Sequence, residues 1–153
     1  MCSRCLLLVA SLPLVVVSAA CGDPPPTRVP LEGGWVGTYE CAADSKRLTL
    51  TVADNDEGEA AGEAFLDYQL VILGTPYLLT ARAELSAAGM DDDGSFEATV
   101  DVLDNATSQL PDFALTATPN DEVDELDGTL TRLDGEGAPT GDPCDVHLGR
   151  TEL

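Results

Sequence analysis

Residues 33–41 read GGWVGTYEC, in which apolar or small residues alternate with Val, Thr and Glu. In an extended chain, one face of this segment would carry Trp35, Gly37, Tyr39 and Cys41. Successive side chains of a strand point to opposite sides of a sheet, so this alternation predicts a β-strand with one face towards a core.

The same alternation recurs along the rest of the chain, broken by clusters of Asp, Asn, Gly and Pro, and no helical period is sustained. The further segments are residues 48–52, 60–73, 77–85, 96–102, 113–118, 126–131 and 144–150. One apolar face per segment and mostly short connections predict an all-β domain. We expect an eight-stranded antiparallel up-and-down β-barrel, with a β-sandwich as the alternative.

The first twenty residues differ in character from the rest. A short start with one cation, Arg4, precedes the apolar run 6–17, and the small residues 18–20 follow. This order is typical of a cleavable secretory signal peptide. The apolar run is shorter than the roughly 20 residues that span a bilayer, and Pro13 interrupts it, which argues against a transmembrane helix. The sequence therefore predicts an exported protein.

Ser18-Ala19-Ala20-Cys21 resembles the lipobox of bacterial lipoproteins, in which the cysteine is lipidated and becomes the new N-terminus. The resemblance implies a lipoprotein anchored to a membrane through Cys21 and facing the periplasm or the cell surface. Residues 22–30 contain four prolines, which favour an extended polyproline II spacer. We therefore divide the chain into a signal peptide (1–20), a lipid-anchor cysteine with a Pro-rich linker (21–32) and one barrel domain (33–153).

Export and processing also decide how the cysteines are used. Cys2 and Cys5 leave with the signal peptide, and Cys21 is the expected lipid site. Cys41 and Cys144 then remain as a pair in an oxidising compartment. There a disulfide is the expected state, and two buried free thiols are the alternative.

Gly33-Gly34-Trp35 fits the Gly-x-Trp motif that opens the first strand of lipocalins and related calycin barrels. The resemblance implies a barrel whose tryptophan closes one end, with an arginine from the last strand packed over it. Arg150 is on the inward face of the last predicted strand. If Cys41 lies opposite Cys144 in antiparallel strands, six residues back along the first strand and six forward along the last also bring Trp35 opposite Arg150. Both pairings thus indicate one register.

The charge of the chain limits its partners. All 28 acidic residues and six of the seven basic residues follow Cys21, which leaves the mature chain with a net charge of −22. This charge repels nucleic acid and anionic lipid headgroups, so we expect neither as a partner of the folded domain.

The domain offers little material for catalysis. Its single histidine, His147, is expected on the outward face of the last strand. No serine lies in a Gly-x-Ser-x-Gly turn, and the expected disulfide leaves no free cysteine in the mature chain to act as a nucleophile. We therefore expect no enzymatic activity and no cofactor.

Acidic loops are the weak candidates for metal binding. Residues 54–59 read DNDEGE, with Asp54 and Asp56 at alternate positions and a glycine for the turn. The stretch does not fit an EF-hand loop, because Gly58 and Phe65 occupy positions where oxygen donors are needed. We interpret it, together with the acidic stretches 91–94 and 121–125, as solubilising hairpin loops.

Small residues gather on the predicted inward face of the strands. They are Gly37, Ala64, Ala81, Ala83, Ala98, Ala117 and Gly128. Small side chains inside a barrel are compatible with a cavity for a small apolar ligand, and equally with tight closure around the aromatic residues.

An apolar patch is expected on the hairpin within residues 60–85. Val71 and Leu73 lie opposite the predicted inward face, and Leu78 lies across the predicted turn at residues 74–76. Clustered exposed aliphatic side chains mark an interface with a protein partner or a second copy, unless the hairpin folds over and buries them. We therefore expect a membrane-tethered, non-catalytic protein that binds a small apolar ligand or a protein partner. A protease-inhibitor-like module is the architectural alternative.

Overall fold

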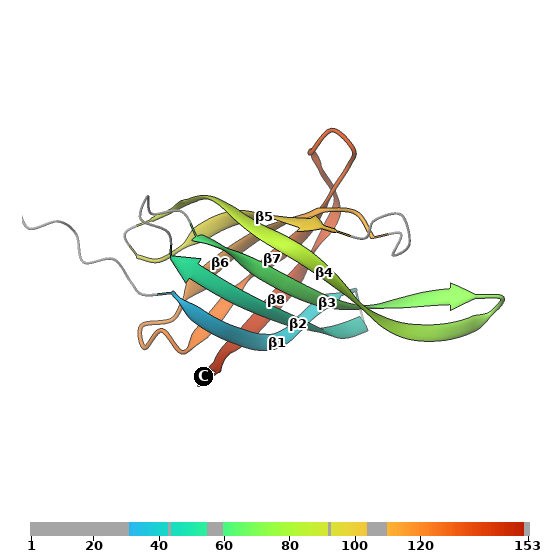
Figure 1. The fold of residues 1–153 in the computed structure, drawn as a ribbon, viewed down its shortest axis with the longest axis horizontal. Helices are drawn as coiled ribbons and strands as arrows, with labels where there is room; N and C mark the ends of the chain where they lie inside the picture. The colour runs from blue at the N-terminus through green and yellow to red at the C-terminus, as the bar shows by residue number, and fades with distance from the viewer. Residues whose placement is uncertain (1–30, 43, 55–59, 92, 104–109, 152–153) are drawn as a thin grey trace, which may run out of the picture.

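The computed structural model describes residues 31–42, 44–54, 60–91, 93–103 and 110–151, which form a closed antiparallel β-barrel (Figure 1). The strands are β1 (Gly33–Cys41), β2 (Asp44–Asp54), β3 (Ala60–Ile72), β4 (Thr75–Met90), β5 (Phe96–Val102), β6 (Phe113–Pro119), β7 (Glu125–Leu133) and β8 (Pro139–Thr151). Each strand pairs with the next, and β8 returns to β1. The up-and-down barrel is therefore confirmed, and the sandwich alternative is excluded. Among the described residues, no helix is long and apolar enough to cross a membrane.

The apolar alternation of the sequence becomes the barrel core. Every strand contributes buried side chains to it, and in β5 they occupy every second position. The largest fully buried side chains are Trp35, Leu31, Leu48, Leu50, Leu66, Leu115, Leu126, Leu130, Val52, Val100 and Val146. Because the strands close into a ring, one inward face per strand is enough to make a continuous core.

The closure of β1 against β8 has the predicted register. Trp35 lies opposite Arg150, and Tyr39 lies opposite Val146. One step beyond this ladder, Cys41 and Cys144 are joined by a disulfide with an S–S distance of 1.99 Å. The disulfide prediction is thus confirmed, and the bridge lies at the end of the barrel opposite Trp35.

Trp35 closes its own end of the barrel. Its indole is fully buried, and its Nε1 donates a hydrogen bond to the carbonyl of Leu31 at 3.0 Å. The guanidinium carbon of Arg150 lies 5.3 Å from the centroid of the indole, a cation–π geometry. Arg150 also donates to the carbonyls of Glu32 and Val123, at 2.7 and 3.2 Å. Leu31, assigned to the linker on sequence grounds, is part of the core, and Arg150 lies exposed at the rim.

The small inward residues serve tight closure. A Cβ atom added to Gly37 would lie 2.0 Å from the carbonyl oxygen of His147, and one added to Gly128 would lie 1.9 Å from that of Thr116. Neighbouring backbones approach so closely there that only glycine fits. Of the two interpretations of these residues, close packing therefore describes the middle of the barrel.

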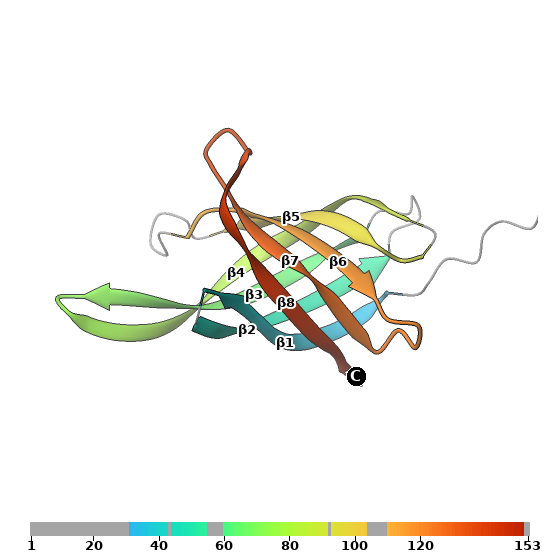
Figure 2. The same cartoon turned by 180° about the vertical axis from the view of Figure 1, so that it is seen from behind.

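The hairpin of β3 and β4 is longer than the barrel and projects from it as a two-stranded arm (Figures 1 and 2). We define the arm as residues 69–80. Its turn is Leu73-Gly74, with φ angles of 51° and 83°, and Ile72 pairs with Thr75 across it. The predicted turn at residues 74–76 was wrong because Thr75 and Pro76 continue the ladder. The alternation along residues 60–73 and 77–85 also predicts inward positions for Ile72, Tyr77 and Leu79, but all three are exposed where the strands leave the barrel.

Candidate functional site

A cup opens at the disulfide end of the barrel, with a volume of about 400 Å³. Its apolar wall comes from Tyr39, Tyr68, Phe113, Leu110 and the disulfide. Its polar lining includes Lys46, Gln69, Arg132 and Asp142. Mostly apolar walls with a few polar groups, enclosing a volume of this size, are typical of small-molecule sites in proteins.

The cup is the last inward layer of the barrel strands. Lys46 precedes the inward residues Leu48 and Leu50 at the same spacing along β2. Arg132 follows Leu130 in the same way along β7. The alternation that buries leucines in the middle of the barrel therefore directs two cationic side chains into its mouth.

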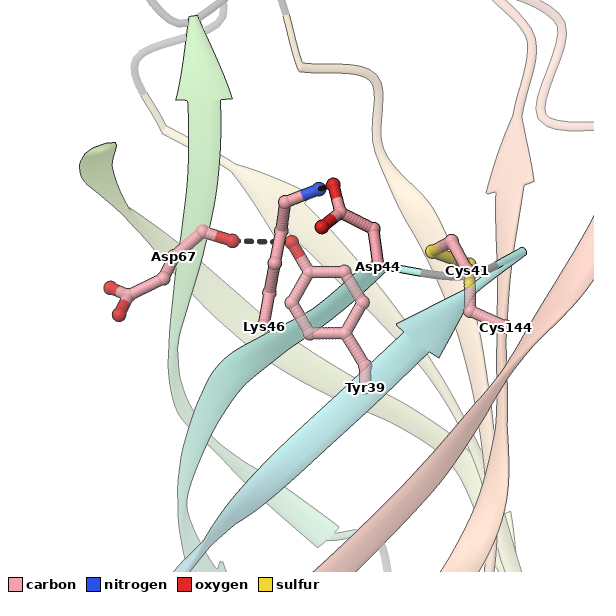
Figure 3. The surroundings of a disulfide bond; sticks show 6 residues. All are labelled: Tyr39, Cys41, Asp44, Lys46, Asp67 and Cys144. Atoms are coloured by element: carbon pink, nitrogen blue, oxygen red, sulfur yellow. Dashed lines mark hydrogen bonds and ion pairs between the residues drawn. A yellow bond between two sulfur atoms is a disulfide. The ribbon is translucent and has the colours of Figure 1, made fainter. Parts of the chain in front are cut away.

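Tyr39 forms part of the floor of the cup, next to the disulfide (Figure 3). Its hydroxyl donates a hydrogen bond to the carbonyl oxygen of Asp67. Burial, followed by the negative charges of Asp67 and Asp44, raises the pKa of Tyr39 to about 12. At neutral pH the phenol therefore stays protonated, and it presents a neutral aromatic face to the cup.

The two cations of the cup differ in their surroundings. The Nζ atom of Lys46 forms an ion pair with Asp44 at 3.0 Å, shown in Figure 3. Among the described residues, the guanidinium of Arg132 forms no ion pair, and Asp142 is the one carboxylate among the residues that line the cup. Arg132 is thus the cup's available hydrogen-bond donor for an incoming anionic group.

A second hollow of about 410 Å³ lies at the other end of the barrel, over β5 and β6. It is lined by Met90, Asp91, Ser95, Phe96, Glu97, Thr116, Ala117 and Thr118. Both charged groups of this lining are carboxylates, and the hollow is broadly open to solvent. It therefore offers less enclosure than the cup and no cation.

The arm begins at the edge of the cup and exposes apolar side chains on both of its faces. Val71, Leu73 and Leu78 have exposed fractions of 62%, 101% and 72%, so the alternative in which the hairpin folds over and buries them is excluded. Tyr77 and Ile72 are also about half exposed. No residue of the arm carries a charge. Clustered apolar exposure of this kind marks a contact surface.

The remaining predicted residues are not part of the cup. His147 lies on the outer face of β8, where its Nδ1 is 2.7 Å from the Oδ1 atom of Asp127. Asp54 ends β2, and Asp56 and Cys21 lie outside the described residues. Within the described part of the chain, no group of three or more His, Cys, Asp or Glu side chains is arranged for a metal ion.

The described residues of the acidic stretch 91–94, which are Asp91, Asp93 and Gly94, form part of a turn. The Oδ1 atom of Asp93 accepts a hydrogen bond from the amide of Ser95 at 2.9 Å, and the amide of Gly94 donates to the carbonyl of Asp91 at 3.0 Å. The bond from Ser95 lowers the pKa of Asp93. These contacts support the interpretation of this stretch as a hairpin loop.

Sequence reasoning missed Lys46 and Arg132 as functional residues. The signal that could have found them is the alternation itself, which continues from Leu48 back to Lys46 and from Leu130 on to Arg132. At both positions a cation replaces the apolar residue by which an inward position is recognised. Burying a cation in the middle of the barrel would cost its hydration. A cation at an inward position near a strand end therefore indicates that the barrel is open there.

Known proteins do not identify the chain. Neither a family model, nor a curated protein, nor a solved structure matches it. The cup and the arm are therefore the features from which a function can be inferred.

Proposed function

We propose that this protein is an exported, membrane-tethered and non-catalytic binding protein whose cup takes a small organic molecule with an apolar body and one anionic group. The observation that carries this proposal is the pairing of aromatic walls with Arg132 in an enclosure of about 400 Å³. An aromatic or aliphatic body fits against Tyr39, Tyr68 and Phe113. A carboxylate or sulfonate fits against the Arg132 guanidinium.

The anionic group is the feature that distinguishes this proposal from a purely apolar ligand. Six basic residues follow Cys21, and two of them, Lys46 and Arg132, line the cup. In a mature chain of charge −22, the cup is thus a local exception to the acidic surface. Asp44 offsets the charge of Lys46, which leaves Arg132 as the main recognition group.

The position of the cup supports a tethered binding protein. The chain enters the barrel at Leu31, which is packed under Trp35 at the closed end. The arm projects from the opposite end, as Figure 1 shows. The residues that line the cup, among them Cys41 and Cys144, lie at that end as well. A lipid on Cys21 would therefore anchor the closed end and leave the open end accessible.

Fluorescence of two matched dyes tests the ligand class. The dye 8-anilino-1-naphthalenesulfonate carries an anionic group, and N-phenyl-1-naphthylamine has the same aromatic body without it. We expect Arg132→Gln to weaken binding of the sulfonate by about tenfold and to leave binding of the neutral dye unchanged. Arg47→Gln is the matched control, because Arg47 lies on the outer face of β2 beside Thr49 and Phe65.

Two results would contradict the proposal. Equal loss of sulfonate binding in Arg47→Gln and Arg132→Gln would indicate an effect of overall charge. Loss of binding in a variant that carries Val71→Thr, Leu73→Ser and Leu78→Thr would place the dyes on the arm instead. Thermal unfolding of each variant shows whether the barrel is intact.

The anchor is tested separately. If Cys21 is lipidated, Cys21→Ala should move the protein from the membrane fraction to the soluble fraction. Globomycin, which inhibits the lipoprotein signal peptidase, should leave the precursor uncleaved. Fractionation and mass spectrometry of the N-terminus measure both effects, and a soluble wild-type protein with an unmodified N-terminus would contradict the anchor.

A further inference from the structure

The two strands of the arm lack neighbours on their outer sides. The ladder between β2 and β3 ends at the pair Leu48–Leu66, and the ladder between β4 and β5 starts at Ala83–Val102. Beyond these pairs, the described residues provide the arm with no further strand on either side. Two strand edges with apolar side chains are thus exposed, an arrangement that proteins usually avoid because it invites pairing with another chain.

The hydrogen-bond pattern shows which backbone groups these edges present. The carbonyl of Arg82 accepts a hydrogen bond from the amide of Leu103, the residue that follows β5. The amide and carbonyl groups of Arg82 therefore point towards β5 and away from β3. By the alternation of an antiparallel ladder, Pro76 and Leu78 also point away from β3. Their ladder partners, Val71 and Gln69, point away from β4.

The two edges are not equivalent. On β4, Pro76 has no amide hydrogen, so a strand added at this edge would lose one ladder hydrogen bond. On β3, both Gln69 and Val71 present an amide and a carbonyl. Nearer the barrel, the carbonyl of Asp67 accepts from the hydroxyl of Tyr39, which ends the exposed part of the β3 edge at the rim of the cup. The β3 edge is therefore the one built to accept another strand.

The charge distribution indicates which protein would supply the added strand. The arm is uncharged, whereas the mature chain has a net charge of −22. Two copies approaching side by side would repel each other, but two copies meeting through their arms bring neutral, apolar surfaces together. The arm projects from the barrel (Figure 2), so a contact through the arms would place the two acidic barrels on either side of it. An antiparallel pair of identical edges is also self-complementary about a twofold axis.

We propose that the β3 edge of the arm pairs antiparallel with the β3 edge of a second copy and forms a symmetric dimer. The backbone groups of Gln69 and Val71 join the two strands into a four-stranded ribbon. The apolar side chains of Leu70, Val71 and Ile72 on β3 pack against those of the partner's β3 on the two faces of the ribbon, and Leu78 on β4 lies outside this contact. This dimer does not depend on whether the cup holds a ligand.

Sedimentation velocity of the mature Cys21→Ala protein, with its disulfide intact, tests the proposal. Wild-type arms should give a concentration-dependent dimer. Val71→Pro removes an amide from the β3 edge and should raise the dimer dissociation constant about tenfold or more. Leu78→Pro is the matched control, because it removes an exposed aliphatic side chain and an outward amide from the β4 edge. It should retain the dimer.

A charge pair tests the contact without relying on proline. Val71→Glu and Val71→Lys should each be monomeric, because like charges would face each other across the twofold axis. An equimolar mixture of the two should form a heterodimer. Circular dichroism and dye binding in the cup report whether each variant keeps its barrel.

The proposal is overturned if the wild-type protein stays monomeric at the highest concentration at which it is soluble. It is also overturned if Val71→Pro and Leu78→Pro behave alike, or if the charged variants do not associate when mixed. Flotation of the Cys21→Ala protein with phosphatidylcholine vesicles, without dimer formation, would show instead that the arm enters a bilayer.

Discussion

Arg150 and Arg132 each occupy an inward register position at the end of a strand, one at each end of the barrel. Arg150 stacks on Trp35 and donates to two backbone carbonyls, whereas Arg132 faces the open cup. The same residue type therefore closes one end and marks a binding site at the other, and the difference lies in what each guanidinium contacts. A closed end needs its polar groups satisfied within the protein, while an open end can satisfy them with a ligand.

Arg150→Ala should destabilise the barrel by roughly 1–3 kcal/mol, because it removes the cation–π contact with Trp35 and the hydrogen bonds to Glu32 and Val123. Arg150→Lys should restore part of that loss. Arg82→Ala, which removes an exposed ion pair with Glu63, serves as the control and should cost less than about 1 kcal/mol. Urea unfolding measures all three. Equal effects at positions 150 and 82 would contradict the structural role of Arg150.

His147 offers a prediction about pH. The hydrogen bond to Asp127, with smaller contributions from the charges of Asp127, Asp145 and Glu40, raises the pKa of His147 above its usual value. The protonated imidazole therefore contributes to the free energy of unfolding. This contribution is complete below a pH of about 6.5, the pKa of an unfolded histidine, and is lost as the pH rises through the folded-state pKa. An NMR titration of this single imidazole should show a lower pKa in Asp127→Asn. An unchanged pKa would mean that the contact does not form in solution.

At the scale of elements, alternation located all eight strands but not the point at which β3 and β4 leave the barrel. Leu70 and Ile72 continue the period set by Leu66 and Tyr68, so the sequence alone places all four inside. The barrel ends where the neighbouring strands end, and neither β2 nor β5 extends along the arm. The exposure of Ile72 follows from those neighbours and not from its own segment.

Leu73 is an unusual choice for the arm's turn, because a leucine with positive φ costs roughly 1–2 kcal/mol. Two-residue turns with positive φ at both positions favour Asn-Gly. Leu73→Asn should therefore raise the free energy of unfolding by roughly 1 kcal/mol, which corresponds to an increase of about 4 °C in Tm. Leu73→Ala is the control: it removes the exposed side chain, retains the strain and should give no gain. Calorimetry that shows no difference between the two variants would contradict the strained turn.

At the scale of the whole molecule, the disulfide links the first strand of the barrel to the last. Cys41 and Cys144 are 103 residues apart in sequence, so the bridge restricts the unfolded chain strongly. By loop-closure entropy, we expect loss of the bridge to cost about 4–5 kcal/mol. A Cys41→Ala and Cys144→Ala double variant should therefore melt well below the oxidised wild type. Titration of two free thiols in the unfolded, unreduced wild type would show that the bridge is absent.

Loss of the bridge should also affect the cup, because the disulfide is part of its wall. The Trp35 end lies at the other end of β1 and should be affected less. Tryptophan fluorescence of the single indole and binding of the anionic dye distinguish the two ends. In the variant without the bridge, we expect binding of the anionic dye to fall at temperatures at which the fluorescence spectrum of Trp35 is still that of the folded protein.

The strands, the disulfide and the register that places Trp35 opposite Arg150 could all be predicted from the order of the amino acids. These follow from local period and from two pairs of residues that agree, both of which can be read along one dimension. Three other features could be recognised only in the folded barrel. They are the arm's exposure, the edge left open at Gln69 and Val71, and the meeting of Lys46 with Arg132 at one mouth. Each of these depends on where neighbouring strands stop, because burial and edge pairing are relations between strands that are distant in sequence.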